Sequence, residues 1–133
     1  MPRDKLQILV VEDDATYADF IVETLRGAGH EILLATTGAV ALELAQAHAP
    51  DAVVLDLNLP DATGYDIARA LRRTTLADGA IIILLTADRY PHLDRAEAVG
   101  VDVVLNKPVE SELVTGMIDL IRARRQRRIQ APD

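Results

Sequence analysis

The chain has 133 residues, of which 50% are hydrophobic, 26% charged and 3% aromatic, with a formal net charge of −7 and no cysteine. These figures fit one globular domain with an aliphatic core, and they exclude disulfides, iron–sulfur clusters and thiolate zinc sites. The acidic balance and few aromatics argue against nucleic acid or an anionic membrane as the main partner. We find no membrane-spanning run and no signal peptide, so we expect a soluble cytoplasmic protein.

Short aliphatic runs alternate with segments of helical periodicity along the chain. Such runs favour strands buried on both faces of a parallel sheet, and the alternation predicts right-handed crossovers in a doubly wound (βα)5 α/β fold. The five runs are Leu6–Val11, Ile32–Ala35, Ala52–Leu55, Ala80–Leu85 and Val101–Leu105. The predicted helices contain Tyr17–Leu25 before Gly27, Val40–Ala45 before Pro50, Ile67–Leu71 after a capping box at Thr63–Asp66, Leu93–Val99 between Pro91 and Gly100, and Val114–Ile121.

Four of the five runs end in residues that can carry chemistry. Glu12 and Asp13 follow the first run, Asp56 the third, Thr86 the fourth, and Lys107 the fifth. In an open parallel sheet ligands bind beyond the carboxyl ends of the strands, so these side chains are expected to converge. Three carboxylates without histidine or cysteine favour Mg²⁺. With a nucleophilic aspartate, a hydroxyl and an ammonium group, the set predicts an aspartyl-phosphate site.

Four segments carry a family resemblance: ILVVEDD (Ile8–Asp14), VVLDLNLPDATGYD (Val53–Asp66), IILLTAD (Ile82–Asp88) and LNKP (Leu105–Pro108). Together, in this order, they resemble the receiver domain of two-component response regulators. The resemblance implies a flavodoxin-like, CheY-like fold with strand order 2-1-3-4-5. It also implies a receiver domain over residues 1–121, followed by an arginine-rich helix end or tail over residues 122–133.

The resemblance assigns the roles at the metal site. Asp56 would be the phosphoacceptor and, with Asp13, a ligand of Mg²⁺, for which Mn²⁺ can substitute. Glu12 would act mainly through a bound water. Asn58 would offer its backbone carbonyl to the ion.

The same resemblance assigns the contacts to the phosphoryl group. Thr86 would hydrogen-bond it and Lys107 would pair with it, and the peptide bond between Lys107 and Pro108 is expected to be cis. Asn58 and Asp88 occupy positions that tune phosphoryl loss in this family. A small polar residue and an acid there leave room for a hydrolytic water, so we predict a short-lived phosphoaspartate.

One departure from the family concerns its switch. An aromatic residue usually stands three positions before the lysine, where this sequence has Val104, and phenylalanine often follows Lys-Pro, where it has Val109. We therefore expect signalling through shifts around Thr86 and the fourth helix, or a role as a phosphate relay or sink. Tyr65 and Tyr90 are interpreted as packing residues that lean toward the surface. The histidines are interpreted as surface or loop residues: His30, His48 and His92.

The resemblance also implies partners. A sensor histidine kinase or a histidine phosphotransfer protein would supply the phosphoryl group, so the chain is expected to be a signalling domain rather than an enzyme. It would have only self-phosphorylation and self-dephosphorylation chemistry. A homodimer through the face of the fourth helix, fifth strand and fifth helix is allowed, with no direct binding to nucleic acid.

Two alternatives compete with the receiver. A haloacid-dehalogenase-like Mg²⁺ phosphatase also uses a nucleophilic aspartate, but there a second acid follows two residues later, where this chain has Asn58. The nucleophile here also follows the acidic pair. A pseudo-receiver that binds partners without phosphate is opposed by the complete set of acids, Thr86 and Lys107.

Overall fold

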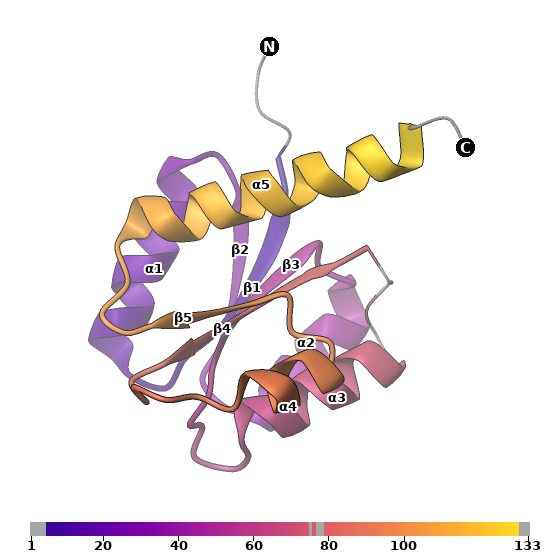
Figure 1. Cartoon of the computed structure of the whole chain (residues 1–133). Helices are drawn as coiled ribbons and strands as arrows, with labels where there is room; N and C mark the ends of the chain where they lie inside the picture. Colours follow the sequence, from indigo (N-terminus) through magenta and orange to yellow (C-terminus); the bar gives the residue numbers. More distant parts are fainter. Residues whose placement is uncertain (1–4, 75, 77–78, 131–133) are drawn as a thin grey trace.

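Within residues 5–74, 76 and 79–130, which the computed structural model describes, five parallel strands form one sheet in the order β2-β1-β3-β4-β5 (Figure 1). The predicted fold and strand order are confirmed. The strands are β1 Gln7–Val11, β2 Glu31–Ala35, β3 Ala52–Asp56, β4 Ile81–Thr86 and β5 Val103–Asn106. The helices are α1 Ala15–Gly27, α2 Gly38–His48, α3 Gly64–Thr74, α4 Leu93–Ala98 and α5 Ser111–Gln130.

Helices cover both faces of the sheet. Helices α1 and α5 lie on one face, and α2, α3 and α4 lie on the other (Figure 1). Strands β3 and β4 are buried along their whole length, which explains their continuous aliphatic sequence. Each fully buried Val, Leu or Ile side chain contributes about 1.5–3 kcal/mol, so these central strands anchor the edge on which the acidic residues sit.

The fifth strand begins two residues later than its aliphatic run. Val101 donates its backbone N–H to the carbonyl of Ala96, and Gly100 donates to Glu97 with a positive φ of 90°. This is how a helix commonly ends, and it draws Val101 into the C-terminal turn of α4. The strand therefore starts at Val103.

Helix α5 continues beyond the predicted apolar stripe. It spans 20 residues and passes through the arginine run without a break at residue 121. Arg125 donates to the carbonyl of Gly79 at 2.5 Å and pairs with Asp102 at 2.6 Å, while Arg72 of α3 pairs with the same aspartate at 3.0 Å. Asp102 thus joins α3 and α5. The proposed division between receiver and tail stays a prediction, and residues 131–133 lie outside the described residues.

Among the described helices, none combines the length and the apolar character that crossing a membrane requires.

Candidate functional site

The site lies at the carboxyl edge of the sheet. Glu12 follows β1, Asp56 ends β3 and Lys107 follows β5, so the parallel arrangement brings three distant segments to one edge. Ligand oxygens of Glu12, Asp13 and Asp56 all lie within 4.8 Å of one another. Glu12 and Asp56 are only 3% and 7% exposed, whereas Asp13 is exposed. The predicted acidic cluster is present.

Lys107 bridges the two buried acids. Its Nζ donates to Oε1 of Glu12 and lies 3.2 Å from Oδ1 of Asp56. The peptide bond from Lys107 to Pro108 is cis, as predicted. The cluster holds three carboxylates and Lys107 supplies one ammonium group, so the cluster retains negative charge.

Burial and charge shift the protonation of this pair. Burial of the Glu12 carboxyl and the nearby Asp56 raise the pKa of Glu12 to about 7, although Lys107 acts in the opposite direction. Burial disfavours the ammonium form of Lys107, but hydrogen bonds and charge attraction from Glu12 and Asp56 outweigh it and raise the pKa of Lys107. Near neutral pH the site therefore carries too little positive charge to balance its carboxylates.

One atom of the cluster lacks a partner. Within the described residues, Oε2 of Glu12 is buried without a hydrogen bond, which is costly for a carboxylate oxygen unless water or a cation reaches it. The donors are all hard oxygens. The cluster of Glu12, Asp13 and Asp56 therefore fits a divalent cation that prefers oxygen, either directly or through water.

Thr86 ends β4 beside the acceptor strand. It lies one residue beyond Leu85, which is in register with Asp56. The side chain is fully buried, and its Oγ1 accepts the backbone N–H of Asp88 at 2.9 Å. Thr86 thus also orders the loop toward α4, where Oδ1 of Asp88 accepts the N–H of Tyr90 at 3.0 Å.

The loop after Asp56 returns tightly to the strand edge. Asn58 is exposed and pairs with Thr63 in an isolated antiparallel bridge. Gly64 donates its N–H to the carbonyl of Leu57 at 2.6 Å. A Cβ on Gly64 would lie 2.8 Å from the carbonyl oxygen of Asp56, so only glycine allows α3 to start this close to the acceptor.

Two residues near the site were not singled out for it by their sequence pattern. Tyr17 fitted the buried stripe of α1, yet Lys107 Nζ lies 4.6 Å from the centre of its ring. Asp61 accepts the N–H groups of Gly38 and Ala39 and so supports the first turn of α2. Both contacts join segments that are remote in sequence, so the local spacing of residues does not predict them.

Two residues are more buried than predicted: Tyr65, expected to pack while leaning toward the surface, and His30, which does lie in a loop, between α1 and β2. Tyr65 is 4% exposed, because α3 and α4 pack against the same face of the sheet. Its hydroxyl accepts the N–H of His92 at 3.3 Å, and Arg95 lies over its ring. His30 is also buried, and its Nδ1 accepts the N–H of Leu6. Tyr90 is 82% exposed, as predicted.

Val104 occupies the position of the missing aromatic. It is partly buried and packs against the core cluster that contains Tyr65 and Leu84. A valine there has no ring that could swing between the site and the surface. In the folded chain, as in the sequence, the place of the usual switch side chain is therefore taken by Val104.

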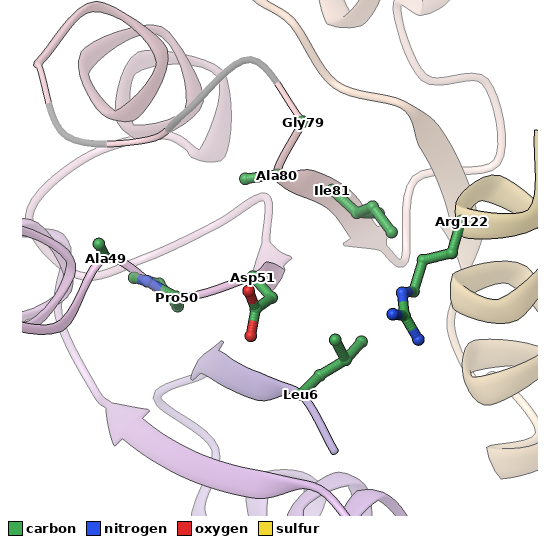
Figure 2. A pocket seen from close by; sticks show the side chains of 8 residues that line it. All are labelled: Leu6, Ala49, Pro50, Asp51, Gly79, Ala80, Ile81 and Arg122. Atoms are coloured by element: carbon green, nitrogen blue, oxygen red, sulfur yellow. The ribbon is translucent and has the colours of Figure 1, made fainter. Parts of the chain in front are cut away.

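A separate cavity of about 330 Å³ lies at the amino ends of β1, β3 and β4 (Figure 2). The acidic cluster lies at the other, carboxyl ends of the strands. Among the described residues that line the cavity, the one carboxylate, Asp51, already accepts the backbone N–H of Gln7 at 2.9 Å. We therefore interpret the cavity as a structural feature of the fold and not as a functional site. It is lined by Leu6, Ala49, Pro50, Asp51, Gly79, Ala80, Ile81 and Arg122.

Comparisons with known proteins agree with this geometry. The family model of the response regulator receiver domain matches residues 8–119. The aerobic respiration control sensor protein ArcB of Escherichia coli (strain K12) is 35% identical over 119 residues, covering 89% of this chain and 15% of ArcB. The DNA-binding response regulator MtrA of Mycobacterium bovis is 34% identical over 137 residues, covering 99% of this chain and 56% of MtrA.

Comparison with a solved structure agrees with the family match. The chemotaxis response regulator CheY4 of Vibrio cholerae superposes with a TM-score of 0.82 at 28% identity, covering 89% of this chain and 99% of CheY4. The chain spans about a seventh to just over half of the length of the curated relatives named above. On the family match, the acidic site and the fold together, this chain belongs to the response regulator receiver domains of two-component signal transduction.

Proposed function

We propose that Asp56 accepts a phosphoryl group from a phosphohistidine of a sensor histidine kinase or histidine phosphotransfer protein. The observation that carries the proposal is the buried Asp56 carboxylate, held 3.2 Å from Lys107 beside Glu12 and Asp13 at the strand edge. A carboxylate oxygen would form the new bond to phosphorus while the bond from phosphorus to the donor nitrogen breaks.

Four residues would hold the metal ion. They are Asp13 and Asp56 through carboxylates, Glu12 mainly through a bound water, and Asn58 through its backbone carbonyl, with Mg²⁺ as the expected ion and Mn²⁺ as a substitute. When bound, the ion would neutralise charge on the phosphoryl oxygens. The partnerless oxygen of Glu12 and the all-oxygen donor set support this assignment.

Lys107 and Thr86 would stabilise the transferred group. The Lys107 ammonium already neutralises the acceptor and can turn one N–H toward a phosphoryl oxygen. The Thr86 hydroxyl uses its oxygen to accept from Asp88, which leaves its own proton free to donate. Asn58 and Asp88 flank these groups and are proposed to set how fast the phosphoryl group is lost.

The wider role follows the family. Matches to the sensor protein ArcB and to the regulator MtrA support a signalling role. We propose a switch or relay in the cytoplasm rather than a turnover enzyme. A homodimer through α4, β5 and α5 is proposed as well. Exposed Leu93, Leu113 and Leu120 on the two helices of that face support it.

The test is Mg²⁺-dependent labelling by acetyl phosphate, followed by intact mass. We expect one phosphoryl group on the wild-type chain, none after Asp56→Asn, and normal labelling after Asp19→Asn, which alters an exposed acid of α1. Labelling that survives Asp56→Asn would refute the assignment. Repeated turnover of p-nitrophenyl phosphate would instead support the phosphatase, and unchanged partner binding by Asp56→Asn would support a phosphate-independent module.

A further inference from the structure

We propose that Tyr17 is a positioning residue for phosphoryl transfer: its ring holds the Lys107 ammonium beside Asp56, and its hydroxyl fixes the backbone after Pro108. This inference rests on the proposed function of Asp56. It adds to that function a side chain from α1 that contacts Lys107.

The start of α1 fixes where Tyr17 lies. Asp14 caps the helix by accepting the backbone N–H of Tyr17 at 2.9 Å, directly after the acidic pair that follows β1. The Tyr17 ring is half-buried, and the Lys107 ammonium sits 4.6 Å from its centre. At this distance the negative face of an aromatic ring attracts a cation.

A second contact comes from the same side chain. The Tyr17 hydroxyl accepts the backbone N–H of Val109 at 3.0 Å, and Val109 is itself buried against the cluster beneath α1 and α5. The ring and the hydroxyl therefore contact the loop on both sides of Pro108, at Lys107 and at Val109. The loop that carries Lys107 is tied to α1 at its side chain and at its backbone.

The ring can hold the Lys107 ammonium without occupying one of its N–H donors. Lysine has a long flexible stem, so its ammonium needs neighbours to hold it in one place. An ammonium has three N–H donors, and two of them have partners here in Glu12 and Asp56. The ring attracts the charge without accepting a conventional hydrogen bond, so the third donor stays available for a phosphoryl oxygen.

The experiment compares four variants of the whole chain. Tyr17→Leu and Tyr17→Met remove the ring, and Tyr17→Phe removes only the hydroxyl. Phe20→Leu is the matched control, because Phe20 is the other aromatic residue of α1 and its ring lies 6.2 Å from that of Tyr17. The readouts are the rate of labelling by acetyl phosphate with Mg²⁺ and the NMR shift of the Lys107 ε-methylene protons.

We expect an upfield ring-current shift of those protons in the wild type, Tyr17→Phe and Phe20→Leu, and its loss in Tyr17→Leu and Tyr17→Met. Labelling should slow about fivefold without the ring, the range of a partly exposed cation–π contact, and at most about twofold in Tyr17→Phe. A general loss of packing would not reproduce this pattern, because it would slow Phe20→Leu as well.

The outcomes separate the two proposals. A wild-type chain that takes no label refutes the function of Asp56, while the NMR shift still decides where Lys107 lies. A labelled wild type with equally fast Tyr17→Leu and Tyr17→Met overturns the positioning role alone. Slowing of Phe20→Leu to the same extent, or of Tyr17→Phe to the level of Tyr17→Leu, also overturns the role of the ring.

Discussion

Asp61 accepts a hydrogen bond from the backbone N–H of Gly38 at 2.8 Å, which ties the loop after the acceptor strand to the start of α2. Its other carboxylate oxygen accepts from Ala39 at 3.0 Å. A carboxylate at a helix N-terminus satisfies orphan N–H groups and favours the helix dipole. The neighbouring helix therefore holds one side of the loop that carries Asn58.

This contact predicts a pH dependence of stability. The hydrogen bonds from Gly38 and Ala39 hold the pKa of Asp61 below its ordinary value of 3.8. A lowered folded-state pKa gives stability that is present above pH 3.8 and is lost as the pH falls through the folded value. Asp61→Ala should thus be less stable than the wild type at pH 7, with a gap that narrows below pH 3.8.

Urea unfolding at a series of pH values would measure the gap, with Asp19→Ala as the exposed control on α1. A gap that stays constant down to pH 2 would show that the Asp61 charge plays no part.

Lys107 should weaken metal binding while it assists phosphoryl transfer. Its ammonium contacts Glu12 and Asp56, two of the three carboxylates proposed to hold the ion, and it therefore repels a cation there. Lys107→Ala should raise the affinity for Mg²⁺ about tenfold, a modest share of the Coulomb energy between charges near a protein surface. Labelling by acetyl phosphate should slow.

Calorimetric titration with Mg²⁺ would test this prediction. Lys5→Ala is a control far from the cluster, since Lys5 pairs with Glu31 at the amino end of β2. Weaker Mg²⁺ binding by Lys107→Ala would mean that the lysine supports the ion site instead of opposing it.

Gly64 should be intolerant of even one added methyl group. The Cβ of an alanine would lie 2.8 Å from the carbonyl oxygen of Asp56 and 2.9 Å from Cα of Leu57, and backbone atoms cannot simply move aside. Gly64→Ala should lower the free energy of unfolding by about 1–3 kcal/mol and slow labelling of Asp56.

Gly116 provides the opposite control. It lies inside α5, where an added Cβ meets nothing within 4 Å. Gly116→Ala should therefore raise the free energy of unfolding by about 0.5–1 kcal/mol. Thermal or urea unfolding of both variants would decide, and equal effects would contradict the proposed close approach at Gly64.

The lifetime of the phosphorylated form should depend on Asn58 and Asp88. Both residues are exposed near the acceptor, and neither is bulky enough to exclude a hydrolytic water. Replacing both by larger or basic residues, as in Asn58→Arg with Asp88→Lys, should slow the loss of the phosphoryl group several-fold. The decay of label after removal of acetyl phosphate measures this, and an unchanged decay rate would reject the role of these residues.

The sequence by itself was enough to place the chemistry. Aliphatic runs that end in Glu12, Asp56, Thr86 and Lys107 must bring those residues to one edge, because parallel strands share the direction of their carboxyl ends. The strand order itself came from the family resemblance and not from the periodicity.

The sequence could not decide contacts made across the fold. Tyr17 and Tyr65 each fit a helix stripe equally well as inert packing residues, and only the folded chain sets one against Lys107 and the other against His92. The apolar stripe of the last helix ends at Ile121, yet arginine is a good helix former and Asp102 anchors Arg125. Periodicity reports which face is buried, whereas these side chains are placed by neighbours that are remote in sequence.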